Sequence, residues 1–227
     1  MRILVFDTET TGLPASKIIN PDTLHLWPHI VQFSYLIYDT NTNEIIKTVD
    51  SIVKLNNDKI IPEESIKIHG ITDEMSKTQG IQINLILNDF FYHLRNVDAL
   101  IGHNVSFDIN MIKIELLRII YNNSSFNLKS KYDLHFLTNF KNITCTLQES
   151  IEICNIKAID KYGRSYLKFP KLLELHQHLF ESIPNNLHNS FNDILITLRC
   201  YMKLKYNKDL NNNCGKFIEL SQSLKIF

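Results

Sequence analysis

The chain of 227 residues lacks the features that mark several classes of protein. No apolar run approaches the ~20 residues that a membrane-spanning helix needs. None of its four cysteines belongs to a Cys-x-x-Cys pair, which favours reduced thiols in an intracellular protein. Basic and acidic residues each number 24, so the formal net charge is zero. A broad basic surface that coats duplex nucleic acid is therefore not expected, although a cleft that grips a few phosphates is compatible with this charge.

Repeats and Gly/Ser-rich or Pro-rich linkers are also missing, so one large domain is expected. We place this domain at residues 1–206 and expect 207–227, which contains Asn211–Asn213, to be a loosely attached tail. The apolar start, residues 1–6, is too short for a signal peptide and has no small-residue cleavage site. We therefore expect an intracellular protein, cytoplasmic or nuclear, that is neither secreted nor bound to a membrane.

Apolar periodicity and turn residues predict an α/β domain with a mixed sheet. Residues 122–130 are polar and are expected to form an exposed loop, as are residues 157–168. Strands are predicted at 3–6, 31–39, 44–54 and 98–102, with a strand or strand-to-helix turn at 143–147. Helices are predicted at 62–70, 81–95, 103–121, 170–180 and 188–205.

Two acids, Asp7 and Glu9, close the first predicted strand. In extended chain, side chains two residues apart point to the same side. Neighbouring carboxylates repel each other unless a cation neutralises them, and the natural partner is a hard divalent ion such as Mg²⁺ or Mn²⁺. The alternative for an isolated Asp-x-Glu is a solvated acidic turn.

Three later residues are candidate partners of this pair. Asp108 follows a buried strand near a helix start, where a helix cap is the alternative. Asp193 lies inside the last long helix, where a buried aspartate is costly without a partner. His188 precedes Asp193 by five residues and reaches the same site if it lies in the loop or first turn; an ordinary surface histidine is the alternative.

Three ordered motifs resemble those of the DEDDh 3′–5′ exonuclease family, which includes the proofreading subunit of bacterial DNA polymerase III, RNase T and Trex-type enzymes. They are the segments 7–13 (Asp-Thr-Glu-Thr-Thr-Gly-Leu), 102–108 (Gly-His-Asn-Val-Ser-Phe-Asp) and 188–193 (His-Asn-Ser-Phe-Asn-Asp). A secondary hallmark, His-Gly-Ile-Thr, is present at 69–72. Ser190 departs from the alanine usual in the family. Segments 27–32 and 169–175 resemble a subgroup found in large DNA viruses and some cellular organisms.

The resemblance implies a ribonuclease H-like fold with about five strands and a two-metal hydrolysis at the 3′ end of DNA, releasing nucleoside 5′-monophosphates. It assigns Asp7, Glu9, Asp108 and Asp193 to two Mg²⁺ or Mn²⁺ ions, and His188 to the role of general base. The substrate would be single-stranded or frayed DNA, with a polymerase as a partner in trans. The residues that it places beside the substrate are Thr8, Thr10, Thr11, Leu13, Ile68, His69, Asn104 and Phe107.

Two other functions stay open from the sequence. The family includes exoribonucleases, and the motifs do not separate DNA from RNA. A non-catalytic nucleic-acid-binding module is the third hypothesis, against which the complete set of acids argues. The segment 157–168 carries lysine, arginine and tyrosine side chains that could contact phosphates and bases; a solvated surface loop is the alternative.

Overall fold

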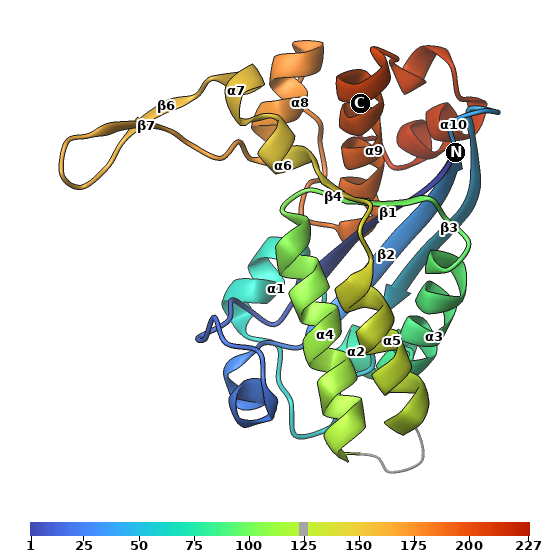
Figure 1. Ribbon diagram of the computed structural model, residues 1–227, viewed down its shortest axis with the longest axis vertical. Coiled ribbons are helices and arrows are strands. Elements are labelled where there is room, and N and C mark those ends of the chain that lie inside the picture. The colour runs from blue at the N-terminus through green and yellow to red at the C-terminus, as the bar shows by residue number, and fades with distance from the viewer. Residues whose placement is uncertain (123–126) are drawn as a thin grey trace.

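A twisted five-stranded sheet with helices on both faces forms the centre of the computed structural model, which describes residues 1–122 and 127–227 (Figure 1). The strand order is β3-β2-β1-β4-β5. Strands β1, β2 and β3 pair antiparallel, whereas β4 and β5 continue the sheet parallel to β1. The strands are β1 (Arg2–Thr10), β2 (Ile30–Asp39), β3 (Glu44–Ile52), β4 (Ala99–Gly102) and β5 (Ile143–Cys145).

Strand β1 lies in the middle of the sheet because its apolar residues are buried on both sides. Leu4 and Phe6 face one cluster of core side chains, and Ile3 and Val5 face another. All four are at most 1% exposed. A strand covered on both faces reads as a continuous apolar run, which is the pattern of residues 3–6.

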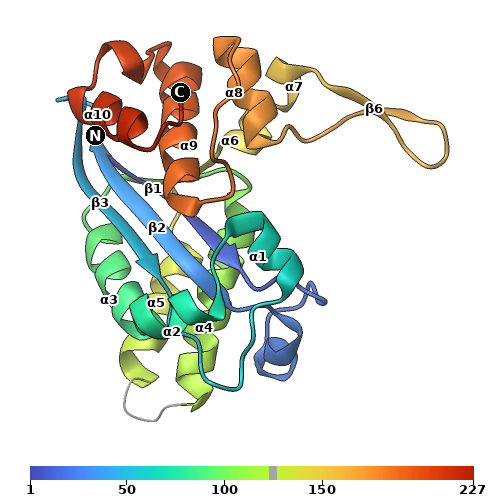
Figure 2. The same cartoon turned by 180° about the vertical axis from the view of Figure 1, so that it is seen from behind.

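The two faces of the sheet are covered by different helices (Figures 1 and 2). On one face lie α3 (Ile83–Leu94), α4 (Val105–Asn122) and α5 (Asn127–Asn139); on the other lie α8 (Leu172–Phe180), α9 (Ser190–Tyr206) and α10 (Gly215–Ser223). Shorter elements complete the described chain: η1 (Pro21–Leu26), α1 (Glu63–His69), α2 (Asp73–Gln79), α6 (Thr146–Glu149), α7 (Ile151–Cys154) and η3 (Leu210–Asn212). The predicted α/β fold with a mixed five-stranded sheet is confirmed. No helix in the described ranges is both long and apolar enough to cross a bilayer.

Helix α5 corrects the prediction of a loop through residue 130, because it begins at Asn127. Part of that predicted loop, residues 123–126, lies outside the described residues. Within α5 the buried positions include Ser130, Asp133 and Leu137. Two of these three are polar, so the helix has little apolar periodicity from which it could be predicted.

Residues 157–168 form a hairpin rather than an irregular loop. Strands β6 (Lys157–Ile159) and β7 (Ser165–Leu167) pair antiparallel and make a separate two-stranded sheet. This hairpin extends away from the rest of the molecule, and the two opposite views agree on this (Figures 1 and 2). The prediction of a loop is therefore corrected to a projecting β-hairpin.

The chain after residue 206 is packed against the core, so the prediction of a loosely attached tail is wrong. Leu210, Phe217 and Ile226 are each 0% exposed and belong to the cluster beneath α9. Arg199 of α9 holds this segment in place: its Nε and Nη2 atoms each donate to the Asp209 carboxylate at 2.8 Å. The Arg199 guanidinium also lies 4.5 Å from the ring centre of Phe227, the last residue.

Candidate active site

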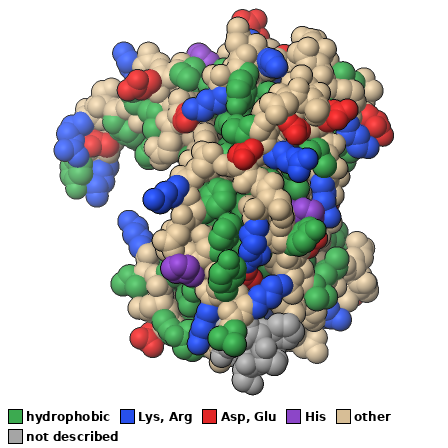
Figure 3. Space-filling model, turned by 45° about the vertical axis from the view of Figure 1, so that its right-hand side comes forward, with side chains coloured by type: hydrophobic (Ala, Val, Ile, Leu, Met, Phe, Trp, Pro, Cys, Tyr) green, Lys and Arg blue, Asp and Glu red, His purple; other side chains and the backbone are tan. Residues whose placement is uncertain are grey.

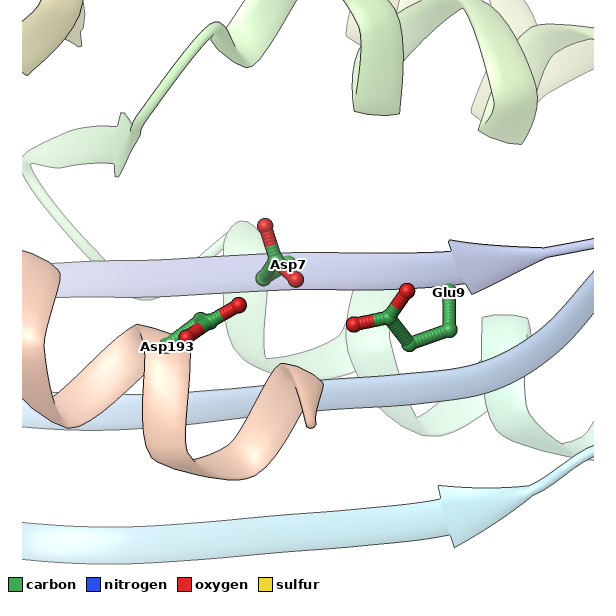
Figure 4. A group of neighbouring side chains, drawn as sticks. All are labelled: Asp7, Glu9 and Asp193. Atoms are coloured by element: carbon green, nitrogen blue, oxygen red, sulfur yellow. The ribbon is translucent and has the colours of Figure 1, made fainter. Parts of the chain in front are cut away.

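Asp7 and Glu9 project together from the last part of β1. In the register of the sheet, Asp7 lies opposite Ser34 and Glu9 opposite Gln32 of β2. The two acids are alternate residues of a strand and so share one face. Figure 4 shows the Glu9 carboxyl turned back toward Asp7 and toward Asp193 of α9.

Asp193 of α9 completes a cluster of three carboxyls with Asp7 and Glu9. One carboxylate oxygen from each residue lies within 4.8 Å of the others. The Oδ1 atom of Asp193 is buried and has no hydrogen-bond partner within the described structure. A buried acceptor without a partner is costly, so this oxygen is suited to a ligand that brings positive charge.

Asp108 of α4 lies beside this cluster without joining it. Its Oδ1 accepts hydrogen bonds from the Thr8 backbone amide at 3.0 Å and from the Thr8 hydroxyl at 2.7 Å. Thr8 lies between Asp7 and Glu9 in β1, so its side chain points to the opposite face of the sheet. The central strand thereby positions Asp7 and Glu9 directly and Asp108 through Thr8.

The two aspartates supplied by helices have the same local setting. Asp108 and Asp193 are each the fourth residue of their helix, α4 or α9. Just before these helices the backbone turns through a positive φ, 61° at Asn104 and 65° at His188. Asparagine and histidine are among the residues that tolerate this conformation best. Both carboxyls therefore lie at the positive end of a helix dipole, which favours their charged forms.

The carboxyls on β1 have raised pKa values. Burial raises the pKa of Asp7 well above its usual range, and the charges of Asp108, Asp193 and Glu9 add to the rise. Burial, followed by the charges of Asp193 and Asp108, raises the pKa of Glu9 to about 8. Without a cation, these groups therefore favour their neutral forms.

The helix-borne carboxyls show the same direction. Burial raises the pKa of Asp108 to about 7, although the two hydrogen bonds from Thr8 lower it. Burial also raises the pKa of Asp193 to about 7, with the His188 backbone amide opposing the rise and the charge of Asp108 adding to it. Buried carboxyls with raised pKa values are typical of a functional site. Carboxylate oxygens are also the ligands that hard divalent cations take.

Most of the chain matches a known protein family. A model of the RNase T family, described as "Exonuclease", matches residues 4–201. The chain belongs to the DEDDh-type 3′–5′ exonuclease family. The match spans the strand that bears Asp7 and Glu9 and both helices that bear the aspartates.

Curated relatives of this exonuclease include subunits of a bacterial polymerase. The DNA polymerase III subunit epsilon of Buchnera aphidicola subsp. Schizaphis graminum is 31% identical over 153 residues, which cover 65% of this chain and 54% of that protein. The subunit of the same name from Rickettsia typhi is 30% identical over 116 residues, covering 51% of this chain and 44% of that protein. The chain thus spans about half the length of the curated relatives it matches.

Solved structures support the fold assignment. Exonuclease I is matched over 98% of this chain and 43% of its own, with a TM-score of 0.61 and 18% identity. Exonuclease I of E. coli in complex with a dA16 oligonucleotide is matched over the same 98%, with a TM-score of 0.57 and 16% identity. These similarities establish a ribonuclease H-like architecture. The resemblance to a subgroup of large DNA viruses stays a prediction.

His188, the predicted general base of this exonuclease, lies in the turn that leads into α9. Its side chain is exposed and lies outside the carboxyl cluster. A hydrogen bond from its backbone amide lowers the pKa of Asp193. Asn189 caps the helix that follows, accepting hydrogen bonds from the amides of Phe191 and Asn192. His188 thus directly precedes an anchored helix start, and its role as the general base stays a prediction.

The residues after Glu9 form an open rim. The Thr10 hydroxyl donates to the Gly12 carbonyl at 2.7 Å, and Thr11 exchanges hydrogen bonds with the His29 backbone. Gly12 has φ 149°, which side-chain-bearing residues rarely adopt, and the turn leaves Leu13 86% exposed. An exposed leucine beside a polar turn is consistent with the predicted contact to a nucleobase, which stays a prediction.

The other predicted substrate residues differ in how open they are. Ile68 is 58% exposed, whereas His69 is 8% exposed and its Nδ1 accepts from the Ile71 amide. Asn104 is exposed, and Phe107 is half-buried against the core cluster under α4. Thr8 is the exception: it is 6% exposed and occupied with Asp108, so its position does not support the predicted substrate contact.

A hydrogen-bonded network that anchors α9 is not evident from the motifs. The buried hydroxyl of Ser190 shares a 2.6 Å hydrogen bond with that of Ser34, which itself donates to Asp50 at 2.8 Å. The Ser190 amide donates to Gln32 Oε1 at 3.2 Å, and Gln32 Nε2 donates to Asp50 at 2.8 Å. The only signal for this network in the sequence is serine at position 190, where the family usually has alanine.

Proposed function

We propose that this exonuclease releases nucleoside 5′-monophosphates from the 3′ end of DNA with the help of two divalent ions, Mg²⁺ or Mn²⁺. One observation carries the proposal: Asp7, Glu9 and Asp193 converge to within 4.8 Å, and Asp193 offers a buried oxygen without a partner. Carboxylate oxygens are the ligands that these hard cations prefer. We take residues 1–206 as the catalytic unit.

Each residue of the proposed centre has a distinct task. Asp7, Glu9 and Asp193 would hold the cations, with Asp108 as the fourth acid, set beside them by Thr8. When bound, two divalent ions stabilise the attacking and leaving oxygens of an in-line displacement and lower the pKa of the attacking water. His188 would accept the proton of that water, and the 3′ oxygen of the next nucleotide would leave.

The choice of DNA is supported by the relatives. Three of them are DNA polymerase III epsilon subunits, and a solved relative of the same fold holds a dA16 oligonucleotide. We propose single-stranded or frayed DNA as the substrate and a polymerase as a partner in trans. With these partners, the proposed activity would lie inside the cell.

The test is a side-by-side digestion of single- and double-stranded DNA and RNA that carry a label at the 5′ end. We expect a ladder that shortens from the 3′ end of single-stranded DNA, with 5′-monophosphates as products. The reaction should require Mg²⁺ or Mn²⁺ and stop in EDTA. Digestion of RNA alone would establish the exoribonuclease alternative instead.

Asp7→Ala is the matching loss-of-function variant, because it removes a carboxyl from the centre of the cluster. We expect no hydrolysis and an intact fold by circular dichroism. Asp58→Ala is the control, since the Asp58 side chain is 68% exposed and lies outside the cluster. Normal turnover by purified Asp7→Ala protein would remove the cluster from the reaction.

A further inference from the structure

The projecting hairpin concentrates positive charge in a chain whose net charge is zero. Residues 157–168 contain four basic side chains and a single acid, Asp160. They also present aromatic rings to solvent: Tyr162 is 70% exposed and Tyr166 is 50% exposed. Figure 3 shows blue basic and green apolar side chains side by side at the end of this arm. The arm thus combines the two kinds of group that grip a single-stranded nucleic acid.

The tip of the hairpin is an ordered turn. Asp160 accepts hydrogen bonds from the backbone amides of Tyr162 and Arg164 at 2.8 and 2.9 Å, and from Arg164 Nε at 2.8 Å. Lys161 Nζ and the Arg164 guanidinium lie 5.0 and 5.2 Å from the ring centre of Tyr162. The single acid of the arm therefore fixes the turn, and two cations flank an exposed ring.

The base of the hairpin is tied to the loop that leads to the active site. His103, five residues before Asp108, lies with Nε2 3.1 Å from the Pro170 carbonyl and Nδ1 2.9 Å from the Thr146 hydroxyl. Burial lowers the pKa of His103 to about 4, so the ring is neutral near pH 7. Pro170 lies three residues after the end of β7, so the arm is anchored beside the helix start that carries Asp108.

We propose that the β6–β7 arm holds the substrate strand on the 5′ side of the scissile bond. Tyr162 stacks on a base, and Lys161 and Arg164 contact the adjoining phosphates. The inference rests on the proposed function, because the strand bound by the arm is the substrate of the proposed catalytic centre. It adds a second contact region, which short substrates do not reach and long ones do.

The experiment compares the double variant Lys161→Glu/Tyr162→Ala with wild type on single-stranded DNA of 4, 8, 12 and 20 nucleotides. We expect KM for the 20-mer to rise at least about fivefold, the loss of one stacked base, with kcat unchanged. For the 4-mer, KM and kcat should stay within about twofold of wild type. The dependence of KM on salt should also weaken for the 20-mer, because a phosphate contact is lost.

The control is Lys131→Glu/Tyr92→Ala, which makes the same chemical change on exposed positions of α5 and α3. Its KM values should match wild type at every length. Anisotropy with a labelled 20-mer in the Asp7→Ala background separates binding from turnover. The hairpin belongs to neither large core cluster, so we expect circular dichroism to show an intact fold for the hairpin variant.

Two outcomes separate the two proposals. Suppose that wild type releases nucleotides but the KM of the hairpin variant does not rise for the 20-mer, or rises as much for the 4-mer. The arm is then not a strand-holding surface. If wild type digests no nucleic acid of any length, the proposed function itself fails and the arm loses its substrate. A length-dependent loss confined to the hairpin variant supports both.

Discussion

Among single residues, the three clustered carboxyls and the neighbouring Asp108 are buried where their charged forms are disfavoured. Glu9 has its pKa raised to about 8, and Asp108 and Asp193 to about 7, chiefly by burial. A carboxyl with a raised pKa in the folded chain binds protons that the unfolded chain has released. The ion-free protein should therefore be most stable in mild acid and lose stability as the pH rises from about 4 to about 8.

This pH dependence is our first prediction. The free energy of unfolding, measured by urea titration in EDTA, should fall between pH 5 and pH 8, and Asp193→Asn should flatten the fall because it removes a titrating group. Saturating Mg²⁺ should raise the melting temperature more at pH 8 than at pH 5.5, since ionised carboxyls bind the cation. An equal metal effect at both pH values would argue that the cluster does not hold the ion.

His188 is the subject of a second prediction at this scale. Replacing it by alanine should slow hydrolysis by about 10²–10⁴-fold, the usual contribution of a general base. Rapid-quench single-turnover rates measure the step itself, and His135→Ala, at an exposed position of α5, is the control. A loss of less than threefold with chemistry rate-limiting would exclude His188 as the base.

At the scale of elements, the position of α9 depends on its contacts with β2 and β3. Gln32 is 3% exposed and joins the Ser190 amide at the start of α9 to Asp50 of β3. The Ser34 hydroxyl donates its hydrogen bond to Asp50. The Ser190 hydroxyl must therefore be the donor in the hydrogen bond between Ser34 and Ser190. The first residue of the helix is thereby fixed through both its amide and its hydroxyl.

The third prediction follows from this network. Gln32→Ala leaves a buried amide without its acceptor and should lower the free energy of unfolding by about 1–3 kcal/mol. Gln148→Ala, at an exposed site of α6, should change it by less than about 0.5 kcal/mol. If the two variants unfold at the same urea concentration, the network does not stabilise the start of α9.

Elements with a strong apolar pattern could be predicted from the sequence, and weakly patterned ones could not. The alternation of β1 placed Asp7 and Glu9 on one face, as Figure 4 shows. Helix α5 was missed because polar Ser130 and Asp133 occupy buried positions. The hairpin was missed because strands exposed on both faces need no alternation of apolar and polar residues. No local pattern brings Asp193 to β1; the cost of a buried helical aspartate makes it a candidate partner, and the family resemblance assigns it to the same site.

On the scale of the whole molecule, the chain end is part of the core beneath α9. The buried residues Leu210, Cys214 and Phe217 recur at helical spacing, but the run Asn211–Asn213 between them favours the prediction of an exposed segment. The packing of residues 207–227 links this segment to the helix that bears Asp193. Stability and the geometry of the site are therefore connected through α9.

The fourth prediction tests this packing. Phe217→Ala should lower the free energy of unfolding by about 3–5 kcal/mol, because a fully buried phenyl ring is replaced by a cavity. Tyr92→Ala, whose ring is 66% exposed, is the control and should have little effect. Urea denaturation measures both variants, and similar midpoints for the two would restore the view of a loosely attached tail.

The wide spacing of the acids along the chain has a consequence for synthesis. Asp7 and Glu9 lie on β1, whereas Asp193 lies on α9, so a long stretch of chain is synthesised between the two parts of the cluster. A growing chain therefore carries an incomplete cluster until α9 has left the ribosome and packed against β1.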